Sequence, residues 1–124
     1  MVEIIFISLG AILGANTRFE IANKLEKTNQ NNSFFVLTVN TFSSFSLGLF
    51  LSIIDDFNSF IYTYQLVLFF SIGFLGSLST FSSFIYELFD LCLKFKFSRA
   101  LNFFIISLSF GIIAFAFGFL LGNL

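Results

Sequence analysis

The chain consists of long apolar stretches separated by short charged segments. Its charged residues leave four uncharged runs, at Ile4–Thr17, Thr28–Ile54, Phe57–Tyr86 and Ala100–Leu124. The last three exceed the roughly 20 residues with which an α-helix spans a bilayer. The first run is shorter, and it spans the bilayer only if the long side chain of Arg18 places its charge at the membrane interface. We therefore predict an all-α integral membrane protein with four transmembrane helices, near residues 3–19, 34–54, 62–89 and 100–121.

The composition supports a protein that lies almost entirely within the membrane. Of the 124 residues, 57% are hydrophobic and only 10% are charged, and the mean hydropathy is +0.97. These charges are too few to cover a soluble domain, so we predict a single transmembrane domain over residues 1–124. The chain has no histidine and one cysteine, Cys92, and it carries no catalytic triad pattern, so we expect neither zinc chemistry nor an enzyme. A net charge of −1 argues against nucleic-acid binding.

The basic residues are distributed very unevenly between the two sides of the predicted bundle. All six lie around the first or in the third connecting segment: Arg18, Lys24, Lys27, Lys94, Lys96 and Arg99. The positive-inside rule places both segments in the cytoplasm, and both termini outside it. The sequence therefore predicts one preferred orientation.

A cluster of hydroxyl groups lies within the third uncharged run. Residues 77–83, SLSTFSS, place five hydroxyls in seven positions, directly after Gly73 and Gly76. A break in the helix at these glycines would free backbone groups, which membrane proteins tolerate where the backbone is buried or lines a cavity, often at ion sites. The alternative is a continuous helix in which Ser and Thr bond to carbonyls one turn earlier. Spacing alone does not decide between them.

Two pairs of glycines have the spacing of close helix contacts. Gly10 and Gly14 lie four residues apart in the first predicted span, as do Gly118 and Gly122 in the last. Small residues at this spacing let two backbones approach closely in lipid, although glycine is common enough in membrane helices for such pairs to arise by chance.

Several motifs resemble those of the CrcB/Fluc fluoride channels. Residues 73–84, GFLGSLSTFSSF, followed by Glu87, resemble the signature G-x-x-G-G-x-T-T-F-S-T-F…E. Residues 37–48 resemble the second-helix pattern L-x-V-N…S-F…G, and residues 14–19, GANTRF, resemble G-A-x-x-R-Y. In the fourth span Asn102 and Ser107-x-x-x-Gly111 form a looser match. The matches follow the order of the four predicted spans.

The resemblance implies a passive channel subunit that exports fluoride across the bacterial cell (inner) membrane and so relieves fluoride toxicity. It implies an antiparallel dimer with two pores and a third helix broken near its middle. Arg18 matches a position at the pore mouth. The backbone carbonyls of Gly76 and Ser79 match the ligands of a structural sodium ion at the dimer centre. The positions that match the fluoride pore are Asn40, Phe81, Ser82, Ser83, Phe84 and Ser107.

These residue types suit a small, strongly hydrated anion. Serine hydroxyls and the Asn40 amide donate hydrogen bonds without carrying a fixed charge. Aromatic rings have positive edges, so Phe81 and Phe84 can receive an anion edge-on, although with 23 phenylalanines in the chain simple packing is the alternative for any one of them. Ser77 replaces a glycine and Ser79 a threonine of the family pattern, which leaves the strength of sodium binding open.

Two other functions compete with a fluoride channel. A small proton-coupled multidrug transporter also has four helices, but it needs a carboxylate deep in the membrane, and the acidic residues lie at the ends of the predicted spans. A non-conducting structural partner subunit, in which the serines only join helices, is the other alternative.

The charge distribution also bears on assembly. An antiparallel homodimer requires insertion in both orientations, whereas the basic residues are divided six to none. We therefore predict a heterodimer with a homologous chain of reversed bias.

Overall fold

The computed structural model describes residues 1–27, 32–57 and 59–124, and every regular element in these ranges is helical. The start of the uncharged run at residue 28 lies outside them. Four helical segments within the described ranges are long and apolar enough to cross a membrane, as predicted. The elements are α1 (Val2–Lys27), α2 (Asn32–Asp56), α3 (Thr63–Leu66), the π-helix η1 (Val67–Leu75), α4 (Gly76–Leu78), α5 (Phe81–Leu93) and α6 (Phe97–Gly122).

The first span reaches membrane length because its helix continues well beyond the short uncharged run. Helix α1 passes through Arg18 without interruption and ends at Lys27. Lys24 and Lys27 lie in its last turn, where positive charge interacts favourably with the helix dipole. The helix thus continues beyond residue 19, where the predicted span ends, because a charged residue such as Arg18 does not terminate a helix.

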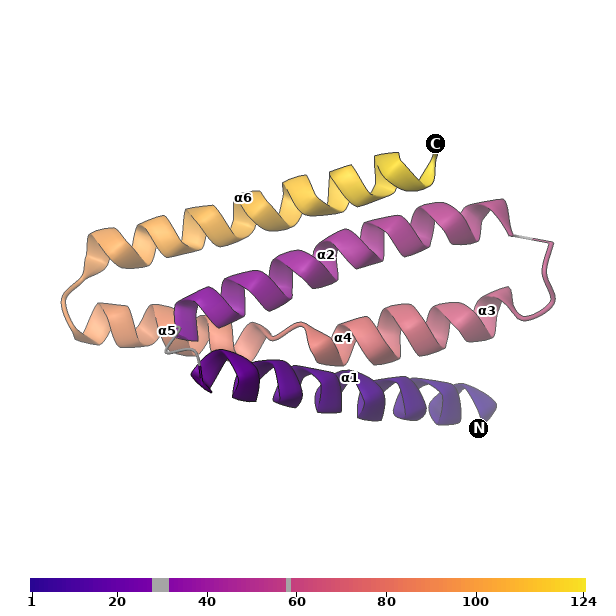
Figure 1. The fold of residues 1–124 in the computed structure, drawn as a ribbon, viewed down its shortest axis with the longest axis horizontal. Coiled ribbons are helices and arrows are strands. Elements are labelled where there is room, and N and C mark those ends of the chain that lie inside the picture. Colours follow the sequence, from indigo (N-terminus) through magenta and orange to yellow (C-terminus); the bar gives the residue numbers. More distant parts are fainter. Residues whose placement is uncertain (28–31, 58) are drawn as a thin grey trace.

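The helices run up and down, so that both termini lie at the same end of the molecule (Figure 1). The C-terminal end of α1 and the turn between α5 and α6 lie toward the opposite end. The basic residues of these two regions, including Lys24 and Lys94, are thus separated from the termini along the long axis, as the sequence predicts.

Glycines allow two pairs of helices to pack with their backbones in contact. Between α2 and α6 the arrangement is reciprocal, because a Cβ atom on Gly48 would meet the carbonyl oxygen of Phe115 and one on Gly118 that of Phe45. The sequence prediction of close contacts at the paired glycines is confirmed, and Gly48 is an additional partner that it did not include. Because the obstacles are backbone atoms, larger residues cannot be accommodated by a change of rotamer.

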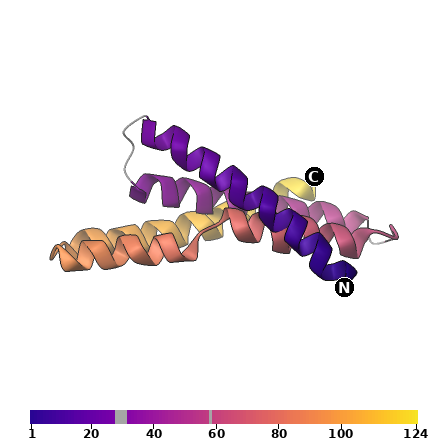
Figure 2. The ribbon, with the colours of Figure 1, turned by 90° about the horizontal axis from the view of Figure 1, so that it is seen from below.

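Helix α1 packs in the same way against the first half of the third span. Gly10 and Gly14 are buried against the backbone carbonyls of Phe69 and Phe74, and a Cβ atom on Gly73 would come within 3.0 Å of the Gly10 Cα. Figure 2 shows α1 crossing this half of the span at a steep angle and then diverging from α5. The third span is consequently covered by α1 only as far as the end of α4.

Candidate ion site at the end of helix α4

Two residues with extended backbone separate α4 from α5 in the middle of the third span. Ser79 has φ −69° and ψ 154°, and Thr80 has φ −139° and ψ 106°. This short coil is visible between the two helices in Figure 1. Thr80 is only 3% exposed and caps α5, because its Oγ1 atom accepts a hydrogen bond of 3.3 Å from the Ser83 N–H.

The side-chain amide of Asn40, on α2, forms hydrogen bonds with both the N–H and the carbonyl group of Thr80. Its Oδ1 atom accepts a hydrogen bond of 2.8 Å from the Thr80 N–H, and its Nδ2 atom donates one of 3.1 Å to the Thr80 carbonyl. The amide thus satisfies the two backbone groups that an extended residue at membrane depth leaves without helical partners. One N–H of the Asn40 amide remains for another acceptor.

These contacts redirect two N–H groups away from the carbonyls that they would meet in a continuous helix. In an α-helix the Thr80 N–H would bond to the Gly76 carbonyl, and the Ser83 N–H to the Ser79 carbonyl. Here the first donates to Asn40 and the second to the Thr80 hydroxyl. The Ser79 hydroxyl is 3.5 Å from the Gly76 oxygen, which is the outer limit of a hydrogen bond. Both carbonyls predicted to hold sodium therefore lack their helical donors, which bond to Asn40 and Thr80 instead.

Phe81 and Phe84 begin α5 with their ring centres 6.4 Å apart. The Phe81 side chain is 76% exposed. Phe84 is half-buried and packs against α6, with its ring centre 5.4 Å from that of Phe103. One ring of the pair is thus fixed within the subunit, while the other projects from it.

Three of the predicted site residues line one cavity between α1, α2 and α5. The cavity has a volume of about 480 Å³, and its lining includes Arg18, Ser82 and Ser83 together with Thr80. A second cavity of about 480 Å³ shares Ser82 and Ser83 and extends to Glu87. Together these spaces form a polar recess beside the first turns of α5, with the Arg18 cation toward one side and two carboxylates, of Glu26 and Glu87, toward the other.

The other predicted pore residues do not line this recess. Asn40 faces Thr80, Phe81 projects from the subunit, and Phe84 packs on α6. The Ser107 hydroxyl, on α6, is buried without a hydrogen-bond partner in the described part of the chain. A single subunit therefore brings together only part of the predicted pore.

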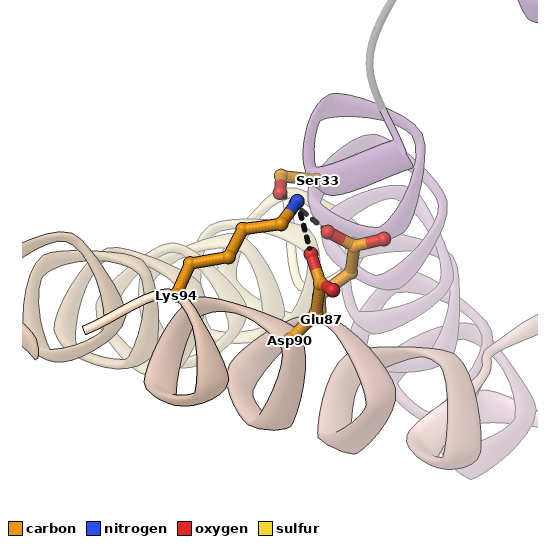
Figure 3. Close-up of polar contacts among 4 residues, drawn as sticks. All are labelled: Ser33, Glu87, Asp90 and Lys94. Atoms are coloured by element: carbon orange, nitrogen blue, oxygen red, sulfur yellow. Dashed lines mark hydrogen bonds and ion pairs between the residues drawn. The ribbon is translucent and has the colours of Figure 1, made fainter. Parts of the chain in front are cut away.

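Two carboxylates of α5 form polar contacts, Glu87 at the edge of the recess and Asp90 beyond it (Figure 3). The Ser33 hydroxyl donates a hydrogen bond of 2.9 Å to Glu87 Oε2, and Lys94 Nζ lies 2.8 Å from Asp90 Oδ2. The hydrogen bond to Asp90 raises the pKa of Lys94, which lies just beyond the span. These acidic groups form polar pairs toward the end of the bundle, rather than a carboxylate at its centre.

A small cavity lined by serines, which was not predicted from the sequence, adjoins the end of α4. It has a volume of about 130 Å³ and is lined by Ser43, Ser44, Leu47, Ser71, Leu75, Gly76 and Ser79. The hydroxyls of Ser43 and Ser71 are buried and have no partner among the described residues. With about 30 Å³ for each water molecule, the cavity has room for a few waters that could satisfy these hydroxyls.

Sequence reasoning also missed Thr80, the residue that caps α5 and pairs with Asn40. One signal was available, because threonine is a favoured N-cap residue and Thr80 directly precedes an apolar helical segment. Its pairing with Asn40 could not be inferred from the sequence, because the two residues are 40 positions apart.

The fold and site define a four-span, all-helical membrane protein with a polar, non-helical dipeptide inside its third span. The family model described as CrcB-like protein, Camphor Resistance (CrcB), matches residues 5–119. The chain belongs to this family.

Relatives with curated names cover nearly the whole chain. It is 63% identical over 123 residues to "Fluoride-specific ion channel FluC 2" of Prochlorococcus marinus (strain NATL2A), covering 99% of both chains. It is 35% identical over 120 residues to "Fluoride-specific ion channel FluC 1" of Parasynechococcus marenigrum (strain WH8102), covering 97% of this chain and 93% of that one. It is 36% identical over 124 residues to "Fluoride-specific ion channel FluC" of Thermosipho melanesiensis, covering 98% and 96%.

Proposed function

We propose that the chain is a subunit of a passive, fluoride-selective channel that exports fluoride across the cell membrane and relieves fluoride toxicity. The observation that carries this proposal is the 63% identity over nearly the whole chain to a relative named as a fluoride-specific ion channel. The donors around the start of α5 supply the chemistry, since a dehydrated anion must receive hydrogen bonds in place of its water.

The proposed pathway begins at Arg18, whose charge attracts anions into the recess between α1, α2 and α5. The hydroxyls of Ser82 and Ser83 lie in this recess and can donate to fluoride. The N-terminus of α5 adds a positive partial charge. Because none of these donors except Arg18 carries a full charge, the anion is stabilised but can still leave.

Asn40, Phe81, Phe84 and Ser107 complete the proposed pathway outside this recess. Asn40 retains one amide hydrogen, and the buried Ser107 hydroxyl has no partner among the described residues, so both have donor capacity for an anion. The edges of the two rings carry partial positive charge.

We propose that two homologous chains assemble as an antiparallel dimer, in which the third span works as a broken helix. The exposure of Phe81 and Gly76 within one subunit supports this, because both belong to the proposed ion sites and need a second surface to enclose them. The one-sided distribution of basic residues favours a heterodimer in the bacterial cell membrane, with the termini of this chain outside the cytoplasm. Relatives bearing the names FluC 1 and FluC 2 are consistent with two such chains.

The proposed cofactor is a structural sodium ion at the dimer centre, held by the Gly76 and Ser79 carbonyl oxygens. These groups fit a small hard cation, because their helical donors are redirected to Asn40 and Thr80. Non-helical carbonyls at the end of a half-helix are a recurrent sodium-binding arrangement in membrane proteins. When bound, the ion would supply positive charge to two oxygens that lack their helical donors.

Flux measurements in liposomes test the proposed function. Liposomes are prepared with the chain alone, with a homologous chain of opposite charge bias alone, and with both chains, and efflux of fluoride, chloride and a cationic drug is measured. We expect passive fluoride efflux without chloride efflux from the pair. Proton-driven drug transport would support the multidrug transporter instead. Fluoride efflux that needs only the partner chain would make this chain a structural subunit.

A further inference from the structure

We propose that Asn40 is a positioning residue for the cation site, and that it acts through the backbone of Thr80. The inference rests on the sodium site of the proposed function. It gives the pathway asparagine a second task, because the same amide that faces the ion pathway would keep the Gly76 carbonyl available to the cation.

The first step of the argument concerns the Gly76 carbonyl. Its donor in a continuous helix is the Thr80 N–H, four residues further along. The Asn40 Oδ1 atom accepts this N–H at 2.8 Å, and the Asn40 Nδ2 atom holds the Thr80 carbonyl at 3.1 Å. With both backbone groups of Thr80 fixed, this residue cannot turn back into the helix. Asn40 therefore maintains the conformation that leaves the Gly76 oxygen without its helical donor.

The second step concerns the Ser79 carbonyl, which depends on the Thr80 side chain in the same way. Its helical donor would be the Ser83 N–H, but this group donates to Thr80 Oγ1 at 3.3 Å. Thr80 is 3% exposed, so water does not compete readily for this contact. The Asn40 amide oxygen thus replaces the Gly76 carbonyl as the acceptor of the Thr80 N–H. The Thr80 hydroxyl replaces the Ser79 carbonyl as the acceptor of the Ser83 N–H.

The third step follows from thermodynamic linkage. If the cation binds only when both carbonyls are free, it stabilises the extended conformation of Ser79 and Thr80, and this conformation in turn favours the cation. Removal of the Asn40 amide or the Thr80 hydroxyl allows the N–H groups to bond to the carbonyls again. The cation must then compete with a helical hydrogen bond, so its apparent affinity falls.

The experiment measures sodium binding without measuring ion flux. The assembled channel is purified with its partner chain, and its unfolding temperature is recorded as sodium replaces N-methylglucamine at constant ionic strength. Asn40→Ala removes both contacts to the Thr80 backbone. Thr80→Val removes the cap while retaining shape, and Thr80→Ser retains the hydroxyl. Asn102→Ala, at an exposed position of α6, is the matched control for loss of an asparagine.

We expect sodium to raise the unfolding temperature of the wild type, Thr80→Ser and Asn102→Ala with the same half-saturating concentration. In Asn40→Ala and Thr80→Val this concentration should rise at least tenfold. An unchanged concentration in Asn40→Ala would overturn the inference, and an unchanged concentration in Thr80→Val would overturn its second step; either result would leave the sodium site in place. A wild type that does not respond to sodium would overturn the proposed sodium site and the inference together, without affecting the proposal of fluoride flux.

Discussion

Phe81 and Phe84 lie on the same turn of α5 with ring centres 6.4 Å apart, but their surroundings differ. Phe84 packs on Phe103 of α6, whereas Phe81 is 76% exposed in the subunit. Packing within the subunit can therefore explain Phe84 but not Phe81. In the dimer that we propose, the second subunit covers Phe81 and completes the ion site.

Replacement of either ring by isoleucine should strongly reduce fluoride flux, because an aliphatic side chain has no positive edge. Phe81→Ile should leave the stability of the subunit unchanged. Phe84→Ile should lower it by about 1 kcal/mol, the energy typical of an aromatic pair. Liposome flux and thermal unfolding measure the two effects. Phe119→Ile is a matched control, since Phe119 also has a ring partner at 6.4 Å, Phe115, within one helix. Normal flux in both single variants would mean that the rings serve only packing.

The glycines of the third span should respond differently to alanine. A Cβ atom on Gly73 would come within 2.6 Å of the Ile7 carbonyl oxygen, whereas the nearest atom for Gly76 would be 3.8 Å away. We expect Gly73→Ala to destabilise the subunit by about 1–3 kcal/mol through overpacking. Gly76→Ala should insert and fold normally, but it should assemble less well or respond less to sodium, because Gly76 belongs to the proposed dimer centre. Gel filtration and sodium-dependent unfolding compare the variants, and equal loss of folded subunit in both would contradict the assignment of Gly76.

Arg18 should matter most at low ionic strength. The Arg18 side chain lines the recess together with Ser82 and Ser83. Its positive charge would raise the local concentration of anions there. Arg18→Gln should reduce fluoride flux several-fold in dilute buffer and less at high salt, because salt screens the attraction. Arg18→Lys retains the charge and serves as the control. A reduction that is the same at every salt concentration would point to a structural role for the guanidinium instead.

The elements that follow local rules could be predicted from the sequence. The lengths of the uncharged runs predict four membrane helices, and the four-residue spacing of the glycine pairs predicts close packing. Both patterns lie within single stretches of the sequence, so neither requires knowledge of contacts between distant residues. The full length of α1 could not be predicted from the uncharged run, since a helix can pass through a charged residue such as Arg18 and continue to Lys27.

The detailed chemistry of the site depends on contacts between distant residues. The resemblance to the CrcB/Fluc pattern indicated Asn40 as a pore position, but it did not reveal that the partner of its side chain is the backbone of Thr80. The serine cavity likewise combines Ser43 of α2 with Ser71 of η1. Neither pair has a sequence spacing from which its contact could be derived.

The one-sided distribution of charge leads to a prediction about insertion. The basic residues are divided six to none between the two sides, and the fold separates the α5–α6 turn from both termini (Figure 1). We expect tags at both termini to be accessible only from outside the cytoplasm, and this chain alone to give little or no fluoride flux. Comparable populations of both orientations, together with flux from the chain alone, would contradict the heterodimer.

A charge-transfer variant tests whether the basic residues cause this orientation. Glu3→Lys and Asp56→Lys add positive charge at the end that holds the termini, while Lys94→Gln and Lys96→Gln remove it from the other end. The balance then changes from six against none to four against two, so a measurable fraction of chains should insert in the opposite orientation. The same four positions changed to Gln serve as the control, with a balance of four against none and one orientation retained. If the charge-transfer variant also keeps one orientation, features other than lysine and arginine determine topology, and the argument from charge for a heterodimer no longer holds.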